Sequence, residues 1–403
     1  MMTPEHSARA EIVRIAEPED PYINLCIEML GPLLTADLLT QRQEFTPGIW
    51  EQRTETDAMR SIPVSDLQKI HEALGNRIER WSLRSGKVNT DQEFRMAGTL
   101  DSWFCIPEDS DWPRALDDLG EKKPYGIWGR GDRSKLNHLT LPSSVAVVGS
   151  RDITSYGTSA TAHIVGDLVE REYCIVSGGA FGIDAVAHRT ALSVTSGKLP
   201  SVALMACGVD RPYPKQNENL LRELINEGLL LSEVALGNSP TRWRFLQRNR
   251  LIAALSGYSL IVEARWRSGA LNTANHALSL GREVGIVPGH IFSPNSEGCH
   301  RLAKKELAHV VTDAQDIVSM MQTKFTPEEE TLDIPLETGR GELPKLSEVQ
   351  SRVWDALPLR RPAPLENIAL MSGLDIRTTM LTLSQLAAKG VALNQNQGWS
   401  KSQ

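Results

Sequence analysis

Short apolar runs alternate with longer, partly polar segments through the middle of this 403-residue chain. The runs are rich in Val, Ile and Leu, as strands are when both faces of their sheet are covered. The segments between them are long enough for a helix that connects two parallel strands. The alternation therefore predicts an α/β domain over residues 143–320, with a doubly wound and mostly parallel sheet. The predicted strands are Val145–Val148, Cys174–Val176, Val202–Met205, Leu229–Leu231, Leu260–Val262 and Val284–Val287.

The residues before this domain show three different patterns. Residues 1–20 are polar and rich in Glu, and we expect them to form a polar tail. Apolar residues recur at helical spacing within 21–96, which predicts a small helical domain. Residues 97–142 are rich in Trp, Pro and Gly, and we expect an irregular connector that leads into the core. The helical spacing is carried by Leu25, Met29, Leu33, Leu34 and Leu38, and then by Ile70, Leu74 and Ile78.

The residues after the α/β domain predict a linker and a small final domain. Residues 321–343 hold several Pro, Gly and Glu, which is typical of an acidic linker. Residues 344–403 contain three helical segments and then the short apolar run Val391–Leu393. Three helices and a short hairpin predict a winged-helix-like domain. The helical segments are Val349–Leu357, Leu365–Met371 and Thr378–Lys389.

Composition narrows the class of protein. Apolar residues make up 41% of the chain and charged residues 23%, as is ordinary for a globular protein. The formal net charge of −7 argues mildly against a nucleic-acid partner, but phosphate binding depends on the local field. The chain begins without a signal-peptide pattern, and no apolar run approaches the roughly 18–20 residues that span a membrane. We therefore expect a cytoplasmic protein with no membrane contact.

The five cysteines are scattered and share no CxxC spacing. An odd, scattered count argues against a disulfide framework and against a zinc site. We expect buried, reduced thiols and no bound metal. These residues are Cys26, Cys105, Cys174, Cys207 and Cys299.

Ligands of an open parallel sheet bind beyond the carboxyl ends of its strands. The first predicted strand ends in Gly149-Ser150-Arg151, and the second ends in a glycine-rich turn over residues 177–184. Glycine lets backbone N–H groups approach an anion closely, and the helix that opens at Ile183 adds its positive end. Arg151 offers a planar fork of donors suited to phosphate. These features favour anion binding, although a turn that needs glycine only for its geometry explains the sequence of this turn equally well.

Arginine gathers in residues 240–270, where six Arg stand against a single acid, Glu263. We expect part of this cluster to contact phosphate, and we expect a helix start to hold Arg248-Asn249-Arg250 at the surface. Among the nearby aromatic residues, Phe181 is the better candidate for stacking on a nucleobase, and Phe245 is expected in the core. The six arginines are Arg242, Arg244, Arg248, Arg250, Arg265 and Arg267.

Two catalytic hypotheses fit less well. A dinucleotide enzyme needs G-x-G-x-x-G after its first strand, and here Gly-Ser-Arg stands there instead. A nucleotide hydrolase could use Glu233 or Glu263 together with Asp184 or Asp210, but no cluster of His, Cys or metal ligands accompanies them. His188 is expected to be a packed helix residue. We therefore expect no enzyme activity and no cofactor, with a nucleotide-processing enzyme or nucleotide-sensing module as the alternative.

Several motifs in order resemble the DprA/Smf family of DNA-processing proteins. The resemblance covers about residues 97–310 and begins with the segment Pro107–Asp132 and the turn Gly149–Arg151. It continues through a glycine-rich turn of the SGxAxGID type, a GxDxxYPxxN loop and an SE…FxxRNR segment. In this chain these are Ser177–Asp184 with Ala187-His188, Gly208–Asn217, and Ser232-Glu233 with Phe245 to Arg250. The last motifs are Glu263 with Ser268-Gly269 and Thr273-Ala274, and Gly281-Arg282 with Pro288-Gly289.

The resemblance implies a Rossmann-like fold with a helical domain in front and a winged helix behind. It implies a homodimer that binds single-stranded DNA and loads the recombinase RecA during natural transformation and recombination. It also implies that Arg151 and Ser177–Gly179 contact DNA phosphates. The chain departs from the family at Phe181, where members often carry Arg, at Leu246, where they carry Pro, and over residues 298–307.

The site residues follow from the motifs and the local charge together. Residues expected to bind DNA or its phosphates are Gly149, Ser150, Arg151, Ser177, Gly178, Gly179, Phe181, Gly182, Lys215, Arg248, Asn249 and Arg250. Residues expected to shape the motifs are Asp184, His188, Asp210, Tyr213, Asn217, Glu233, Glu263, Ser268, Gly269 and Thr273.

Overall fold

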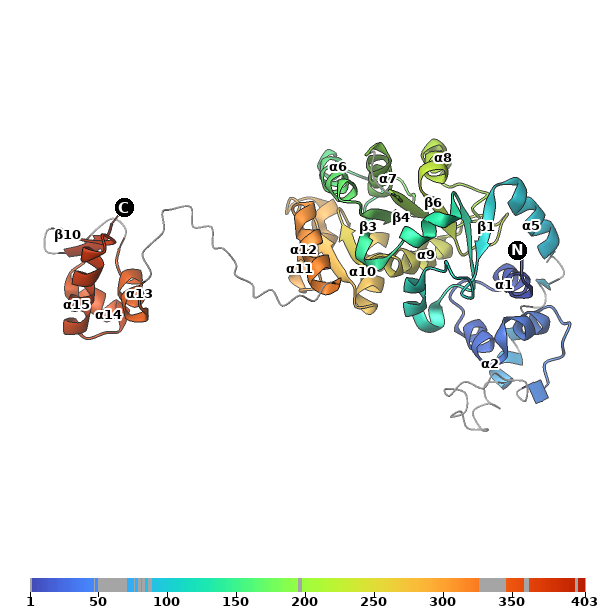
Figure 1. The fold of residues 1–403 in the computed structure, drawn as a ribbon, viewed down its shortest axis with the longest axis horizontal. Coiled ribbons are helices and arrows are strands. Elements are labelled where there is room, and N and C mark those ends of the chain that lie inside the picture. The colour runs from blue at the N-terminus through green and yellow to red at the C-terminus, as the bar shows by residue number, and fades with distance from the viewer. Residues whose placement is uncertain are drawn as a thin grey trace. The chain divides into compact units, whose positions relative to one another are not determined.

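The computed structural model divides the chain into two units, residues 1–328 and residues 329–403 (Figure 1). Each unit has its own core, and we describe each by itself. The structure describes residues 2–46, 48–49, 71–75, 77–78, 81, 84–85, 89–194, 198–325, 346–358, 362–395 and 398–402.

A nine-stranded sheet forms the centre of the first unit, with strand order β1-β2-β6-β5-β4-β3-β7-β8-β9. Strands β3 to β9 run parallel to one another, which confirms the predicted α/β fold. All six predicted strands are present, each displaced by at most two residues, and the two-residue strand β9 extends one edge. Their bounds are β3 Ser144–Val148, β4 Cys174–Ser177, β5 Ser201–Leu204, β6 Leu229–Ser232, β7 Tyr258–Ile261, β8 Glu283–Ile286 and β9 His309–Val310.

Helices cover both faces of the sheet, so side chains that alternate along a strand enter different cores. Val145 and Val147 of β3 pack with α6, α7 and α12, whereas Ala146 and Val148 pack with α9, α10 and α11. Because both faces are apolar, the strands read as continuous apolar runs. The helices are α6 Ser155–Glu170, α7 Ile183–Ser193, α8 Glu218–Glu227, α9 Arg242–Ala254, α10 Gly269–Ser279, α11 Glu297–Lys304 and α12 Ala314–Phe325.

We had expected an irregular connector over residues 97–142, and this prediction is wrong. After α5 (Thr90–Thr99) they form β1 (Ser102–Cys105) and β2 (Ile127–Arg130), which add two antiparallel strands beside β6. Phe104 and Trp128 pack against each other across this pair, with ring centroids 4.6 Å apart. Most of the Pro and Gly residues of this stretch lie in the segments before and after the strands, and Gly129 lies within β2, so the composition concealed the two short strands.

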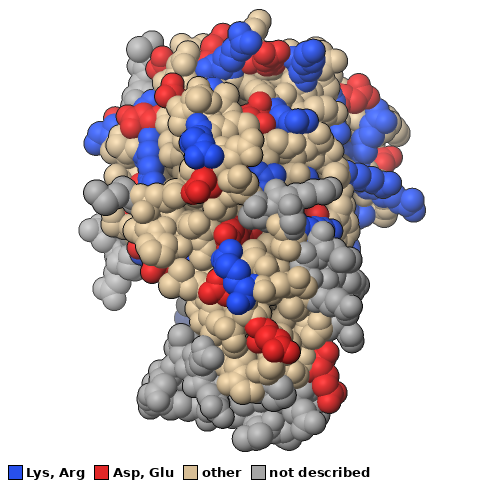
Figure 2. All heavy atoms as spheres, turned by 90° about the vertical axis from the view of Figure 1, so that its right-hand side faces the viewer, with Lys and Arg blue, Asp and Glu red and all other residues tan. Residues whose placement is uncertain are grey.

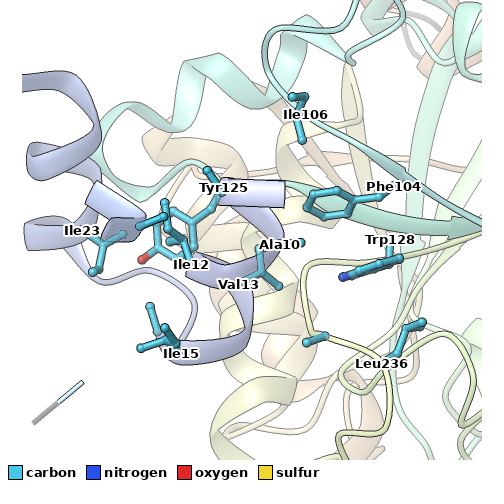
Figure 3. Packing of buried hydrophobic residues seen from close by; sticks show 14 of the residues in the cluster. Ala10, Ile12, Val13, Ile15, Ile23, Phe104, Ile106, Tyr125, Trp128 and Leu236 are labelled. Atoms are coloured by element: carbon cyan, nitrogen blue, oxygen red, sulfur yellow. The ribbon is translucent and has the colours of Figure 1, made fainter. Parts of the chain in front are cut away.

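The expected polar tail is also wrong, because residues 4–15 form a packed helix. Helix α1 (Pro4–Ile15) and helix α2 (Pro21–Leu39) bury apolar side chains in a core that also holds residues of β1 and β2, and Figure 3 shows Ile12 of α1 beside Tyr125. The polar residues of α1 are paired instead of solvated: Arg9 lies 2.7 Å from Glu108, and Arg14 pairs with Glu93. Ion pairing explains how a charged sequence enters the interior.

Helix α2 corrects our expectation that no apolar run reaches the length of a membrane span. Its segment Tyr22–Leu39 is long and apolar enough to cross a membrane, but more than half of the segment is buried inside this unit. Gly31 has φ of 80°, and Pro32 follows, so the helix is kinked near its middle. Its apolar side chains serve the core of the first unit.

The second predicted N-terminal helix is described in part. Residues 71–75 and 77–78 are helical, and Leu74 and Ile78 are buried in the same core, while Ile70 lies outside the described residues. Of the predicted linker 321–343, residues 321–325 belong to α12 and the remainder lies outside the described residues. The boundaries of the other predicted segments stay predictions.

The second unit consists of three helices and a two-stranded antiparallel sheet around a small apolar core. A bridge between Ala363 and Trp399 joins the segment before α14 to the hairpin. The three predicted helices are confirmed, and the predicted winged-helix character of the unit stays a prediction. The elements are α13 Glu348–Asp355, α14 Leu365–Ser372, α15 Ile376–Ala388, β10 Ala392–Gln395 and β11 Gly398–Lys401.

Candidate nucleic-acid interface

A pocket of about 650 Å³ opens at the carboxyl ends of β3 and β7, where the strand order of the sheet reverses. The chain leaves β3 toward β4 and leaves β7 toward β8, so the two loops diverge and leave a crevice between them. Helix α9 forms a further wall. The pocket is lined by Val148–Asp152, Ala180, Asp184, Arg242, Phe245, Leu246, Arg248, Asn249, Ile252, Arg265 and Arg267–Ala270, together with Thr273.

Two glycine-containing turns lie against each other at one side of this pocket. Gly182 has φ of +76°, and a Cβ added there would collide with the backbone oxygen of Ser150. A Cβ at Gly149 would collide in turn with the side chain of Ile183. Close packing of the β3 turn on the β4 turn therefore requires glycine at both positions.

Beneath the surface, polar groups of the chain itself hold the second turn. The carboxylate of Asp184 accepts hydrogen bonds from the backbone N–H of Gly178 (3.2 Å) and of Ala180 (3.4 Å). The Asn217 amide donates to the carbonyls of Gly179 and Ala180, at 3.1 Å each. The buried hydroxyl of Ser177 donates to the carbonyl of Val147 (2.6 Å).

These bonds correct the expected phosphate contacts at Ser177 and Gly178, whose donors are already used inside the fold. Burial raises the pKa of Asp184, and nearby Arg248 and the two backbone N–H groups oppose that shift. Gly179, with φ of +67°, lies in the left-handed region that the turn requires. The turn thus has glycine for its geometry, one of the two explanations that the sequence left open.

His188 is fully buried one layer below the turn. Its Nδ1 lies 2.7 Å from the hydroxyl oxygen of Ser201, whose own proton goes to the carbonyl of Ile175. Burial, with a smaller contribution from Arg248, lowers the pKa of His188 to about 3. The imidazole is therefore neutral at physiological pH and packs as a core residue.

The structure separates the six clustered arginines by environment. Arg250 is 0% exposed and forms two hydrogen bonds of 2.6 Å to the carboxylate of Glu233. It also donates to the carbonyls of Lys122 and Gln247. The expected phosphate contact at Arg250 is therefore wrong, because its guanidinium is buried and four of its N–H groups donate to acceptors within the fold.

Three more of these arginines have partners within the first unit. Arg244 contacts the carboxylate of Glu17 (3.2 Å), and Arg265 pairs with Asp152. Arg248 is buried and donates from one nitrogen to the carbonyls of Gly178 and Leu204. Burial lowers the pKa of Arg248 to about 10, so it keeps its proton.

The RNR segment is therefore not held at the surface. Arg248, Asn249 and Arg250 are all buried, although Arg248 and Asn249 line the pocket. Asn249 donates to the carbonyl of Gly269 (3.3 Å) and to the amide oxygen of Asn272 (3.2 Å), which ties α9 to α10. The buried segment sets the position of the helix that carries the more exposed residues.

Three exposed arginines of the pocket remain without an ion pair to any described residue: Arg151, Arg242 and Arg267. The guanidinium of Arg151 lies 5.1 Å from the ring centroid of Phe245, which is half-buried and lines the pocket instead of filling the core. By contrast, Figure 2 shows a face on which Lys and Arg are interspersed with Asp and Glu. Unpaired cations around a concave surface are the donors that an anionic chain requires.

The strand-end carboxylates have structural partners, which leaves the hydrolase hypothesis without a described pair of free acids. Glu263 accepts from the backbone N–H of Thr154 (3.1 Å) and from its hydroxyl. Asp210 accepts from the N–H of Gly237 (2.9 Å), and Glu233 is bound to Arg250. Each acid fixes a loop at the carboxyl edge of the sheet.

The remaining predicted residues divide between the pocket and its surroundings. Ser268 caps α10 by accepting from the N–H of Ala270 (3.2 Å), and it lines the pocket with Gly269 and Thr273. The side chain of Ser150 is buried and bonds to Asp152 of its own turn. Phe181, Tyr213 and Lys215 are exposed but lie outside the pocket lining.

Sequence reasoning did not assign Arg242 and Arg267 individually, although it placed both in the basic cluster. No pattern in the sequence marks them as unpaired, because the partners of the other arginines come from distant segments such as Glu17 and Asp152. An arginine with no acidic residue nearby in the sequence can still have an acidic partner in the folded chain, so the sequence is a weak guide to which arginines are unpaired.

One further cluster has the composition of a cation site. Cys105, Asp109 and Asp111 lie together, but the guanidinium of Arg133 already bridges the two carboxylates at 2.7–2.8 Å. Burial raises the pKa of Cys105, so the thiol keeps its proton. The five cysteines are all buried and free, as expected.

Comparison with known proteins identifies the family. The family described as DNA recombination-mediator protein A matches residues 103–322. A putative DNA processing protein DprA of Mycobacterium tuberculosis is 33% identical over 99% of this chain and 95% of its own length. The chain belongs to the DprA/Smf family. The resemblance drawn from the ordered motifs is thus confirmed.

Two further DprA/Smf proteins show how far the likeness extends. Protein Smf of Synechocystis is 36% identical, over 73% of this chain and 70% of that protein. The X-ray structure of DprA from Streptococcus pneumoniae superposes with a TM-score of 0.54 at 30% identity and covers 65% of this chain and 88% of that one. The likeness to that structure agrees with the mostly parallel sheet and the helices that cover it.

Proposed function

We propose that this protein binds single-stranded DNA in the pocket at the carboxyl ends of β3 and β7. The observation that carries the proposal is the set of three exposed arginines, Arg151, Arg242 and Arg267, which line the pocket without an ion pair to any described residue. Unpaired arginine gains most from a phosphate, because it gives up no internal partner on binding. Membership of a family of recombination mediators supports the same function.

The finer parts of the proposal follow the family resemblance. The protein acts in the cytoplasm without a catalytic step, forms a homodimer, and helps to load RecA onto single strands during recombination and natural transformation. The backbone of the Gly149–Arg151 turn and the exposed Lys215 add to the phosphate contacts. Phe181, 38% exposed beside the glycine-rich turn, stays a candidate for base contact.

The test is the affinity of Arg151→Ala for a labelled oligo-dT, measured by fluorescence anisotropy across a salt series. We expect a loss of roughly tenfold at low salt, because one charge-assisted contact is removed. The slope of log affinity against log salt should decrease by about one. Wild-type protein should bind a duplex of equal length more weakly than the single strand.

Arg171→Ala is the matched control. Arg171 is also exposed, but it follows α6 at the opposite edge of the sheet and bonds to Gln315. The control should bind as the wild type does. Equal binding by Arg151→Ala and wild type would show that the pocket is not the DNA site.

A pocket of this size also supports the alternative, a nucleotide-sensing module. A volume of about 650 Å³ lies within the range of small-molecule sites. Millimolar deoxynucleoside monophosphate that displaces oligo-dT, and that binds by calorimetry with one site per chain, would favour this alternative.

A further inference from the structure

Two tryptophans stand exposed next to the arginines of the pocket. Trp266 lies between Arg265 and Arg267 in the loop from β7 to α10, and 54% of its surface is exposed. Trp243 follows Arg242 at the start of α9 and is 64% exposed. Tryptophan has the largest apolar surface of any side chain, and leaving it in water costs free energy that only a partner recovers.

Trp266 is held in place from one side. The guanidinium carbon of Arg301, on α11, lies 4.6 Å from the centroid of the Trp266 ring. Such a cation–π contact restrains the indole and leaves the rest of its exposed surface to solvent. A restrained ring loses little conformational freedom when it receives a ligand, so it is a preorganised platform.

The other aromatic side chains around the pocket differ from Trp266 in their contacts. Phe245 is half-buried and already has two neighbours, the guanidinium of Arg151 at 5.1 Å and the ring of Tyr213 at 5.7 Å from its ring centroid. Trp243 has no ring partner among the described residues. Trp266 combines high exposure and a contact with Arg301 with a place in the chain between two arginines that line the pocket, and its own side chain lies outside that lining.

We propose that Trp266 is a base-stacking platform that receives an unpaired nucleobase when the adjoining phosphate is bound by Arg267 and Arg151. This inference rests on the proposed function, since it assumes that the pocket binds a single strand. Aromatic stacking accepts any base, because every base has a π-face, so the platform adds affinity without reading sequence. It discriminates against duplex DNA, whose bases are already stacked inside the helix. Arg301 is a positioning residue that acts through the indole.

Trp266→Leu tests the platform on two ligands of equal length and charge, oligo-dT and an oligomer of abasic sites. We expect an affinity for oligo-dT about tenfold lower than that of the wild type, and an unchanged affinity for the abasic oligomer. Trp266→Phe should recover most of the lost affinity. Arg301→Gln should reduce oligo-dT affinity about threefold, and its effect should vanish in the Trp266→Leu background.

Tryptophan fluorescence supplies an independent readout. Stacking of a base on the indole should quench emission of the wild type on titration with oligo-dT, and most of this quenching should be absent from Trp266→Leu. Thermal melting of each variant checks that the fold is retained, as we expect for an exposed side chain.

The outcomes separate the platform from the function on which it rests. If wild type binds neither ligand, or if Arg151→Ala binds as the wild type does, the proposed DNA site itself is wrong. If Arg151→Ala binds weakly while Trp266→Leu matches the wild type on oligo-dT, the site stands and the platform is overturned. Equal losses on oligo-dT and on the abasic oligomer would also overturn it, because the loss would not depend on a base.

Discussion

The arginines at the rim of the pocket and those beneath it come from one basic cluster but occupy opposite environments. Arg242 and Arg267 are exposed and have no described ion-pair partner. Arg250 lies fully buried against Glu233, and Arg248 lies buried against two carbonyls. Arginine thus stabilises the fold where it is buried and paired, whereas an exposed arginine without an ion pair keeps an uncompensated charge that can attract an anionic ligand.

The difference is a matter of desolvation. Burial of a guanidinium costs free energy that hydrogen-bond acceptors offset, and Arg250 has four such hydrogen bonds to Glu233, Lys122 and Gln247. An exposed guanidinium keeps its water and exchanges it for phosphate at small cost. The predictions below test this division from the largest effect to the smallest.

Arg250→Ala should lower the free energy of unfolding of the first unit by about 3–5 kcal/mol, because it leaves the buried carboxylate of Glu233 unpaired. Urea denaturation followed by circular dichroism measures the loss. The double variant Arg250→Met with Glu233→Leu should recover much of it, since no buried charge remains. A single variant as stable as the wild type would contradict the buried pair.

His188→Asn should make the first unit less sensitive to acid. The pKa of His188 is about 3 in the folded protein against an ordinary value of 6.5, so the unfolded chain takes up the proton first. The contribution of this residue to stability is present above pH 6.5 and decreases as the pH falls from there toward 3.

Between pH 7 and pH 5 the wild type should therefore lose about 2 kcal/mol more than His188→Asn. Urea denaturation at pH 7 and pH 5 measures the change in unfolding free energy of each protein. Subtracting one change from the other removes the contribution of every titratable group that the two proteins share. Parallel losses in the two proteins would mean that His188 is not buried in its neutral form.

Arg242→Ala and Arg244→Ala compare neighbours on the first turn of α9. Arg242 has no ion pair to any described residue, so its loss should weaken oligo-dT binding severalfold, by about 1 kcal/mol, with unchanged stability. Arg244 contacts Glu17 and the carbonyl of Ser239, so its loss should reduce stability by less than about 1 kcal/mol and leave binding almost unchanged. Fluorescence anisotropy measures the oligo-dT affinity of both variants, and urea denaturation measures their stability. Equal binding losses would erase the distinction between paired and free arginines.

The sequence by itself determined the parallel sheet and the edge of the sheet at which the pocket opens. Continuous apolar runs such as Val145–Val148 identify strands covered on both faces, because a polar residue there would be buried without a partner. Turn residues that follow those runs, such as Gly149–Arg151, must gather at one edge, since parallel strands share their carboxyl ends. The order of the motifs along the sequence was also enough to predict the family.

Tertiary structure alone decided which polar residues stay exposed at the pocket and which hold the fold together. Arg250 and Arg242 look alike in the sequence, but only folding brings Glu233 to one of them and leaves the other without an ion pair to any described residue. Helix α1 was hidden for the same reason, because its charges reach Glu108 and Glu93 only in the folded chain. Charge pairing over long sequence distances depends on three-dimensional contacts, which local pattern and composition do not record.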